Sequence, residues 1–407
     1  MIRIGFLGTG FICEFCCDEA QLSSKCVPYA VASRDLKRAQ QFVESKKSKS
    51  LYSNSEPLIA YGSYEDLLKD ESIDVVFIGL PTALCGPVAL DAISYKKHVI
   101  VDKPFVNAQL VRDLHEAALK NRVAFMDGTH FVHSNRLKRV VDLVQSGHAG
   151  TVRVMTSAFT YPFLTVKDLE NGSASPINYN IRFNPSLEPH GAIGDLGWYC
   201  SKVALCMLAF SKKPSKVFAA ATWQNEALPN NEESSKTTEL RKFVSKASCI
   251  VEFGDDGPSL HFDCDFGAGF RNYVEVAGTE KSLKIEDFVL PFRNSPFIPF
   301  RSGEPQSGPP DFNDTYVSVT TALCNAETGQ FGANSDLNPE QIPVQAETSQ
   351  ITAMFDEMGR CVNTLKSLNT DAEIPRDVSH WGEEAFMTQV IVDALSESAK
   401  TGRPVVL

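Results

Sequence analysis

The sequence predicts an α/β protein of two domains, the first built on a parallel sheet and the second an α+β domain with an antiparallel sheet. Three observations lead to this prediction. Short apolar strands alternate with helices through the first 130 residues, which is typical of βαβ units. A glycine pair follows the first strand. Beyond residue 130, strands succeed one another without regular intervening helices.

The first domain, residues 1–130, is expected to form a Rossmann sheet. Residues 73–80, IDVVFIGL, are almost continuously apolar, as a strand buried on both faces requires. Asp35, Ser63 and Asn107 are suited to cap the helices that follow them. The predicted strands are 2–7, 27–33, 73–80, 97–104 and 123–130. The predicted helices are 11–22, 35–44, 62–70, 82–95 and 107–121.

The second domain, residues 131–407, is expected to begin with a helix at 135–147 and to continue as a sheet. Its strands are predicted at 152–159, 216–223, 247–253, 259–266, 272–280 and 282–292. Polar insertions near 224–242 and 301–315 interrupt them. Two helices near the end, 350–367 and 381–400, are expected to pack back on the first domain.

Composition narrows the classes of function. The net charge of −11 argues against a nucleic-acid partner, because phosphate binding needs a basic surface. An apolar run of 18 residues is absent, and the first ten residues lack the pattern of a signal peptide, so no membrane association is expected. The eleven scattered cysteines fit a reducing compartment, and we expect a cytoplasmic protein.

The N-terminal stretch GFLGTGFICEFCC carries two competing signals. Gly8 and Gly10 lie between a strand and a helix, where a dinucleotide fingerprint is credible. Cys13 and Cys16 form a C-x-x-C pattern, followed by Cys17. We favour a structural role for these thiols, with Cys13 in the third small position of the fingerprint. A redox or metal role is the alternative, although no matching Cys or His pair stands at zinc-binding spacing.

The end of the second strand bears on the choice of cofactor. An acidic residue there would bind the free ribose hydroxyls of NAD, but the sequence has Ser33 and Arg34 instead. Arg34 can pair with a 2′-phosphate, and Lys37 and Arg38 add positive charge. This favours NADP over NAD. The alternative is that Arg34 is a solvated surface residue.

Two further segments carry candidate chemistry. In HVIVDKP, Lys103 comes at the carboxyl end of a parallel strand, the edge where ligands of such sheets bind. The alternative is an ordinary surface lysine. In GAIGDLGWY, Asp195 and Tyr199 are four residues apart and would share one face of a helix. The alternative is that Asp195 caps the helix and Tyr199 packs in the core.

These segments, together with ASRDLKRA and the closing DALSESAKTGRPVVL, resemble the glucose–fructose oxidoreductase / inositol dehydrogenase / MocA family over nearly the full length. NIRFNPSLEPHGAIGDLGWY is similar to its dihydrodiol and xylose dehydrogenase-like branch. The resemblance implies a Rossmann domain followed by a large, mostly antiparallel sheet that forms a homodimer face. Two positions depart from the family pattern: Asp102 replaces a glutamate, and Cys85 stands where histidine is frequent.

The resemblance implies hydride transfer between nicotinamide C4 and a secondary alcohol or carbonyl of a sugar, polyol or dihydrodiol, without a metal. Lys103 is expected to be the main proton-transfer group, with Tyr199 assisting and Asp195 orienting, although the sequence leaves the division between Lys103 and Tyr199 open. The substrate side is expected to include His130 and Arg182, with Asn180 and His190 as further candidates. The residues expected to hold NADP are Gly8, Gly10, Phe11, Ile12, Ser33, Arg34, Arg38, Pro81, Thr82, Asp102, Lys103 and Pro104.

Two other functions are compatible with this fold. One is a sugar- or nucleotide-sensing regulator without turnover, which the joint presence of Lys103, Asp195 and Tyr199 disfavours. The other is a lyase or glycosidase that uses bound NAD transiently, which Ser33 and Arg34 disfavour because such an enzyme would have an acid near the ribose.

Overall fold

The structure is a computed structural model that describes residues 1–53, 55–175, 180–226, 241–290, 315–321 and 340–407. Most of the two predicted polar insertions lies outside these residues. The chain divides into two compact units. The first unit comprises Met1–His133 and Ser349–Gln389, and the second unit comprises Ser134–Thr348 and Val390–Leu407. The predicted division into an NADP-binding domain at 1–130 and a substrate-binding and dimerisation domain at 131–407 stays a prediction.

The first unit contains a six-stranded sheet in the order β3-β2-β1-β4-β5-β6, with every neighbouring pair parallel. This order is that of the dinucleotide-binding Rossmann fold, so the predicted fold class is confirmed. The strands are β1 Ile2–Leu7, β2 Cys26–Ala32, β3 Ile59–Tyr61, β4 Val75–Ile78, β5 His98–Val101 and β6 Phe125–Asp127. The helices are α1 Phe11–Gln21, α2 Leu36–Lys47, η1 Ser50–Tyr52, α3 Tyr64–Lys69, α4 Thr82–Ser94, α5 Ala108–Asn121, η2 His130–His133, α10 Gln350–Ser367 and the start of α11 Arg376–Thr401.

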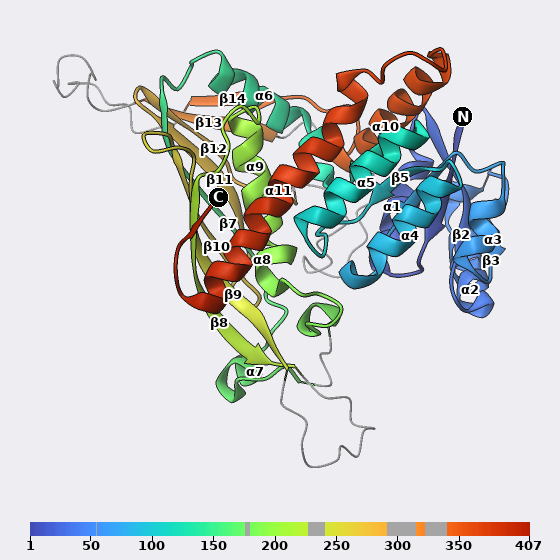
Figure 1. The fold of residues 1–407 in the computed structure, drawn as a ribbon, viewed down its shortest axis with the longest axis horizontal. Coiled ribbons are helices and arrows are strands. Elements are labelled where there is room, and N and C mark those ends of the chain that lie inside the picture. Colours follow the sequence, from blue (N-terminus) through green and yellow to red (C-terminus); the bar gives the residue numbers. More distant parts are fainter. Residues whose placement is uncertain (54, 176–179, 227–240, 291–314, 322–339) are drawn as a thin grey trace. The chain divides into compact units, whose positions relative to one another are not determined.

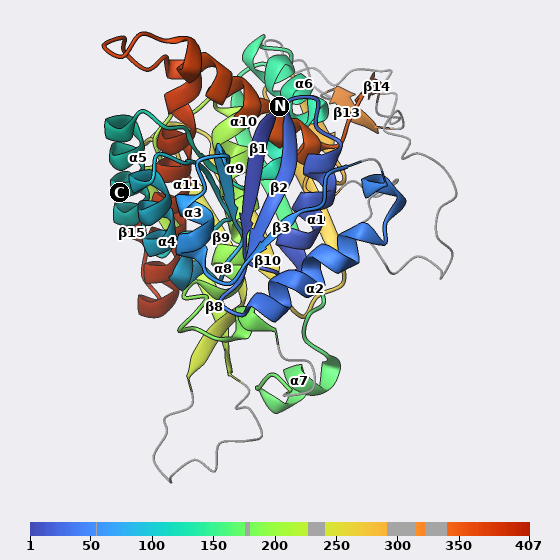
Figure 2. The same ribbon diagram turned by 90° about the vertical axis from the view of Figure 1, so that its right-hand side faces the viewer.

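Helices cover both faces of this sheet, as Figure 2 shows with α1 on one side of the strands and α4 and α5 on the other. All four residues of β4 and all four of β5 are buried, which explains their continuous apolar pattern. From α10, Phe355 packs against Phe6 of β1 and Phe77 of β4, with ring centroids 6.3 and 6.1 Å apart. Residues from near the end of the sequence therefore complete the core of the first unit.

The three predicted helix caps are confirmed. The Asp35 carboxylate accepts from the backbone N–H of Lys37 at 2.9 Å, ahead of α2. Ser63 accepts at the start of α3 and Asn107 at the start of α5, at 3.0 and 2.9 Å. Each side chain satisfies a backbone donor that the first helical turn leaves without a partner. Because α2 begins soon after β2 ends, Arg34 lies in a short connection between the two elements.

The second unit is built on a nine-stranded sheet in the order β14-β13-β12-β11-β7-β10-β9-β8-β15. Its strands are β7 Val152–Thr160, β8 Lys216–Asn225, β9 Lys242–Glu252, β10 Ser259–Asp265, β11 Arg271–Gly278, β12 Lys281–Ile285, β13 Thr315–Thr321, β14 Glu340–Val344 and β15 Val405–Val406. Its helices are α6 Asn135–Gln145, α7 Val166–Asn171, η4 Ile181–Phe183, α8 Gly191–Asp195, α9 Gly197–Met207 and the end of α11.

One pair departs from the antiparallel pairing predicted for this sheet, because β10 runs parallel to β7. The chain leaves β7 through helices before it forms β8, β9 and β10, so β10 returns beside β7 in the same direction. The α8 and α9 helices lie against the sheet (Figure 1), and nearly every residue of α9 is buried. A helix that is apolar on all sides is typical of such a buried position.

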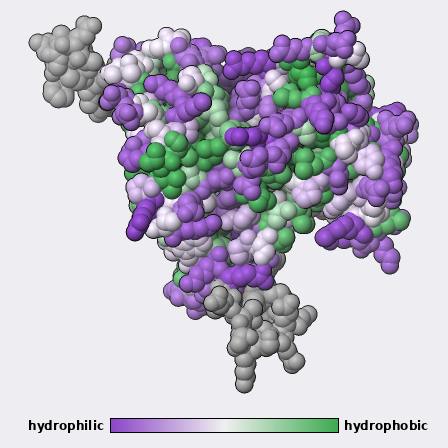
Figure 3. Space-filling model, viewed as in Figure 1, coloured by the Kyte–Doolittle hydropathy of each residue, from purple (hydrophilic) through white to green (hydrophobic). Residues whose placement is uncertain are grey.

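The surface mixes polar and apolar side chains. In Figure 3, purple polar residues surround smaller green groups on the face shown. Among the described residues, no helix combines the length and the apolar character that crossing a membrane would require.

A buried histidine at the start of β5 makes the stability of the fold depend on pH. The Nδ1 atom of His98 accepts from the backbone N–H of Ala124 at 2.9 Å, which requires the neutral ring. Burial, together with the charge of the nearby Lys366, lowers the pKa of His98 to about 4. The unfolded chain, with a histidine pKa of about 6.5, therefore binds a proton that the folded chain does not bind.

We predict that the free energy of unfolding falls as the pH is lowered from about 6.5 to about 4, by up to about 1.4 kcal/mol per pH unit for this one group. Urea unfolding at several pH values measures this slope. His98→Asn keeps an acceptor near the same place but does not titrate, and it should reduce the slope. His261→Asn, at an exposed position of β10, is the control. Equal slopes in the wild type and His98→Asn would contradict the prediction.

Candidate active site

The turn after β1 places two glycines in different environments. Gly8 is buried at φ +115°, and a Cβ there would lie 2.8 Å from the Gly79 carbonyl oxygen. Gly10 is exposed at the start of α1, and no atom lies within 4 Å of where its Cβ would be. Gly8 therefore allows the close approach of β1 to β4, while Gly10 leaves open space in front of a helix N-terminus. Such a helix end favours a phosphate group.

The neighbouring cysteines lie beneath this turn. The thiol of Cys13 contacts the carbonyl oxygens of Leu7 and Gly79 at 3.5 and 3.7 Å. Burial is the main cause that raises the pKa of Cys13, of Cys16 and of Cys17, the last to about 12. Their thiolates are disfavoured, which supports the packing role over a reactive one. In the described part of the chain, no three His, Cys, Asp or Glu side chains gather as metal ligands would.

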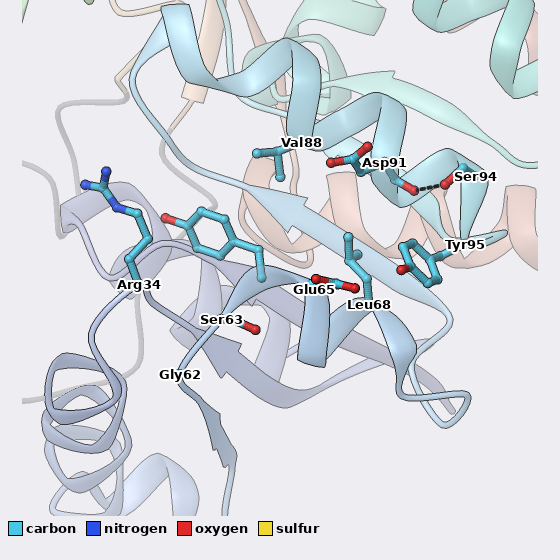
Figure 4. Close-up of a pocket in the computed structure, with 10 residues that line it drawn as sticks. Arg34, Gly62, Ser63, Glu65, Leu68, Val88, Asp91, Ser94 and Tyr95 are labelled. Carbon is cyan, nitrogen blue, oxygen red and sulfur yellow. Dashed lines mark hydrogen bonds between the residues drawn. The ribbon is translucent and has the colours of Figure 1, made fainter.

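Arg34 follows β2, as expected for a residue that contacts the ribose end of a dinucleotide. Its side chain is exposed, whereas Ser33 is buried and its backbone N–H donates to the Tyr61 carbonyl at 3.2 Å. Arg34 also lines a pocket of about 700 Å³ together with residues of α3 and α4. Figure 4 shows Arg34 at one end of this pocket and Tyr95 at the other. Burial raises the pKa of Tyr64, which lines the same pocket, and the positive charges of Arg34 and Arg38 oppose the shift.

The segment after β5 holds Lys103 at the carboxyl edge of the sheet. The backbone N–H of Asp102 donates to the Ile78 carbonyl of β4 at 3.0 Å, and its carboxylate accepts from the N–H of Lys103 at 3.0 Å. A cis peptide bond joins Lys103 to Pro104. The side chain of Lys103 is only 9% exposed, so the alternative of an ordinary surface lysine is wrong.

His130 belongs to the same edge of the first unit. It is 5% exposed, and its Nδ1 atom lies 2.8 Å from the Gln350 amide nitrogen. Burial, together with the charge of Lys103, lowers the pKa of His130 to about 3. His130 is therefore neutral at physiological pH and lies within electrostatic range of Lys103. Gln389 also reaches this segment, because its amide oxygen accepts from the backbone N–H of Phe105 at 3.0 Å.

The second unit carries Asp195 and Tyr199 on two helices, not on the single helix that the spacing suggested. Asp195 ends α8, Tyr199 lies in the first turn of α9, and Leu196 separates the helices. The helical structure is interrupted at Leu196, and both helices pack against the sheet of the second unit. Gly191, at φ +51°, would place a Cβ 2.5 Å from the carbonyl oxygen of Val244 in β9, and a Cβ on Gly197 would lie 3.1 Å from the Phe262 ring.

The carboxylate of Asp195 faces an arginine. Its Oδ2 atom lies 2.5 Å from the Nε atom of Arg182 in η4. The N-cap residue of α9 is Leu196, without a side-chain cap, so the idea that Asp195 caps this helix is wrong. Tyr199 is 8% exposed and packs edge-on against Phe159, with ring centroids 5.3 Å apart.

Asn180 and His190 make local contacts. The Asn180 side chain accepts from the backbone N–H of Arg182 at 3.1 Å and so holds η4. The Nδ1 atom of His190 lies 2.8 Å from the Ser396 hydroxyl of α11, and its Nε2 atom lies 3.7 Å from the Asp393 carboxylate. These contacts fix the start of α8. The sequence analysis missed Ser396, Gln350 and Gln389 because polar residues within helices carry no motif. It also missed the aromatic residues around Tyr199, which the alternating pattern FTYPF of 159–163 marks.

Comparison with known proteins bears on this site. The pattern of the Gfo/Idh/MocA oxidoreductase family, NAD-binding Rossmann fold, matches residues 2–129, and that of the family's C-terminal domain matches residues 137–284. Trans-1,2-dihydrobenzene-1,2-diol dehydrogenase of Mus musculus is 24% identical over 89% of this chain and 97% of its own. The dTDP-3,4-didehydro-2,6-dideoxy-alpha-D-glucose 3-reductase of Streptomyces violaceoruber is 30% identical over 44% of this chain and 46% of its own.

Solved structures show the same fold. A 3-ketoreductase from Actinomadura kijaniata, in complex with NADP and TDP-benzene, has a TM-score of 0.70 at 19% identity and covers 98% of this chain and 97% of its own. Variants of that reductase with one lysine replaced by alanine, or one tyrosine by phenylalanine, have also been solved. An aldose-aldose oxidoreductase from Caulobacter crescentus, complexed with glycerol, has a TM-score of 0.70 at 15% identity and covers 100% of this chain and 99% of its own.

The two glycines yield a paired prediction. Gly8→Ala should lower the free energy of unfolding by about 1–3 kcal/mol, because it forces a strained backbone and a contact with Gly79. Gly10→Ala should leave folding stability nearly unchanged but weaken dinucleotide binding, because its methyl group occupies the space in front of α1. Urea unfolding and fluorescence titration with NADPH measure the two effects. An equal loss of stability in both variants would show that the glycines do not differ in this way.

Proposed function

This chain belongs to the Gfo/Idh/MocA family of NAD(P)-binding oxidoreductases, and we propose that it transfers a hydride between NADP and the secondary alcohol or carbonyl of a sugar, polyol or dihydrodiol. One observation carries the proposal. A nearly buried lysine, Lys103, lies at the carboxyl edge of the same parallel sheet that carries the Gly8–Gly10 turn. Ligands of such sheets bind at this edge. A regulator that only senses a nucleotide has no need of an ionisable side chain there.

The residues of the first unit fit a dinucleotide. Gly10 leaves room for a pyrophosphate before α1, with Phe11 and Ile12 in the first helical turn. Ser33, Arg34 and Arg38 would hold the ribose and its 2′-phosphate. Toward the nicotinamide we assign Pro81 and Thr82, which begin α4, together with the segment Asp102, Lys103 and Pro104. When bound, the nicotinamide supplies or accepts the hydride.

Proton transfer is assigned to side chains of this protein. We propose that Lys103 donates a proton to the substrate oxygen during carbonyl reduction and accepts it during alcohol oxidation, with the Tyr199 hydroxyl stabilising the same oxygen. Asp195 and Arg182 orient the substrate side, and the neutral His130 offers a hydrogen bond without adding charge beside Lys103. The Actinomadura kijaniata reductase was solved with a lysine and a tyrosine replaced, which are the two residue types invoked here.

We also propose a cytoplasmic homodimer. The free cysteines of the described residues support a reducing compartment, and the family resemblance supports a dimer through the sheet of the second unit. Sedimentation of a monomer at micromolar concentration would reject the dimer, and an extracellular location in cell fractionation would reject the compartment.

The proton-transfer assignment leads to a mutational prediction. Lys103→Met, which keeps a linear chain but removes the amine, and Lys103→Ala should both lower kcat by about 10²–10⁴-fold, because a positioned acid–base group contributes that much. NADPH binding, measured by fluorescence, should stay within a few-fold of the wild type. Tyr199→Phe should lower kcat less, and the double variant should lose less than the product of the single losses, because the two groups act on one oxygen.

The screen for turnover uses NADP and NADPH with aldoses, inositols and dihydrodiols. Unchanged turnover in Lys103→Ala would reject the proton-transfer role. NADP binding without turnover of any of these compounds would favour the sensing regulator, and a tightly held NAD with lyase or glycosidase activity would favour the third function.

The cofactor assignment predicts a separate effect of Arg34. Arg34→Ala should raise the Kd for NADP by about 10–100-fold, because a charge-assisted contact to the 2′-phosphate is lost. The Kd for NAD should change by less than about threefold, since NAD lacks that phosphate. Lys47→Ala, at an exposed position near the end of α2, is the matched control for loss of one positive charge. Equal weakening of NAD and NADP binding would show that Arg34 does not contact the 2′-phosphate.

A further inference from the structure

His130 lies in a short helix that is held close to the segment following β5. This helix, η2, follows β6 after a short connection, in which the backbone N–H of Gly128 donates to the Val101 carbonyl at 2.7 Å. A Cβ on Gly128 would lie 3.2 Å from the Cα atom of Asp102, so the two segments pass side by side. The imidazole ring of His130 accordingly lies within electrostatic range of the Lys103 amine.

A second contact of His130 comes from Gln350, the first residue of α10. The amide nitrogen of Gln350 lies 2.8 Å from the Nδ1 atom of His130. An amide nitrogen carries hydrogen atoms and does not accept, so it donates in this contact. Nδ1 therefore accepts, and the single proton of the neutral ring belongs on Nε2. The tautomer of His130 is thus set by a helix near the end of the chain.

The N-terminus of α10 holds Gln350 in place. Ser349 caps this helix by accepting from the backbone N–H of Thr352 at 3.0 Å. The carboxylate of Glu19 in α1, which is 8% exposed, accepts from the hydroxyl of Thr352 at 2.8 Å and also from the hydroxyl of Ser349. The helix dipole favours a carboxylate at this end. Because Gln350 lies between Ser349 and Thr352, its backbone is anchored on both sides.

The position of the proton on His130 matters because of the neighbouring lysine. A neutral imidazole has one donor nitrogen and one acceptor nitrogen, on different edges of the ring. With Nδ1 engaged by Gln350, Nε2 carries the proton and has no lone pair to offer. In the other tautomer, Nε2 would accept a hydrogen bond from the ammonium group of Lys103 and would compete with the substrate oxygen for its proton.

We propose that Gln350 is a positioning residue of the active site, whose amide keeps the proton of His130 on Nε2 so that the proton of Lys103 is kept for the substrate oxygen. This inference rests on the proposed function, since it assumes that Lys103 is the acid–base group. During carbonyl reduction by NADPH, an N–H bond of Lys103 breaks and an O–H bond forms on the substrate, while the carbonyl carbon receives the hydride. His130 keeps its one proton throughout.

Nitrogen NMR of the full chain labelled with ¹⁵N-histidine measures the tautomer directly and needs no turnover. His130→Gln identifies the signals of His130 among those of the eight histidines. The wild type should show an unprotonated Nδ1 and a protonated Nε2. Gln350→Leu removes the donor at similar size and should give a mixture of tautomers. Gln350→Glu places an acceptor there and should put a proton on Nδ1.

Steady-state kinetics test whether the tautomer affects the reaction. With the best carbonyl substrate of the screen, Gln350→Leu should lower kcat at least about fivefold, while the Kd for NADPH stays within about twofold. Asn363→Leu removes an amide from an exposed position of the same helix and is the matched control. It should leave both the tautomer and kcat as in the wild type. A general loosening of α10 would lower stability without moving the proton of His130.

Failure of this inference is distinguishable from failure of the proposed function. If no compound is turned over but the tautomer changes as described, the hydride-transfer proposal falls and the control of His130 by Gln350 stands. A proton on Nδ1 in the wild type, an unchanged tautomer in Gln350→Leu, or a changed tautomer with unchanged kcat would each overturn the inference. Should the Gln350 variants fail to fold, the wild-type spectrum supports or overturns it, according to which nitrogen carries the proton.

Discussion

Lys103 lies in the segment that follows β5, and only 9% of it is exposed to solvent. A buried cation requires nearby polar groups. Its position follows from the sheet. The backbone at Asp102 bonds to the end of β4, and Gly128 after β6 bonds to Val101 at 2.7 Å, so the segment is held from both sides. His130 completes the arrangement by remaining neutral, since burial and the charge of Lys103 both lower its pKa. Of Lys103 and His130, only the lysine therefore carries a positive charge.

The glycine turn after β1 and the lysine after β5 lie at the same edge of the sheet. Parallel strands end at a common edge, so the turn after β1 and the segment after β5 both lie there, although about ninety residues separate them in the sequence. The cysteines next to the turn are part of its packing. A Cβ on Gly79 would lie 2.5 Å from the Cys13 thiol, which shows how closely α1 lies on the strands. A small apolar side chain suits that contact, and its burial disfavours the reactive thiolate.

In the second unit, a series of contacts between charged side chains and aromatic rings leads to Tyr199. Asp195 is held by Arg182, Arg182 lies over Phe163, and ring contacts run from Phe163 back to Phe159 and Tyr199. The break between α8 and α9 at Leu196 sets the direction of Asp195. The positive charge of Arg182 is thus matched by the carboxylate of Asp195.

The sequence by itself determined the parallel βα architecture of the first unit, the caps at Asp35, Ser63 and Asn107, and the position of Lys103 at a strand end. These features depend on local periodicity and on hydrogen bonds within a few residues. Only the tertiary structure decided that Arg182 is the partner of Asp195, that β10 lies parallel to β7, and that Phe159 of β7 contacts Phe270, the residue before β11. Such contacts join residues far apart in the chain, and strand pairing and side-chain packing across that distance leave no periodic signal in the sequence.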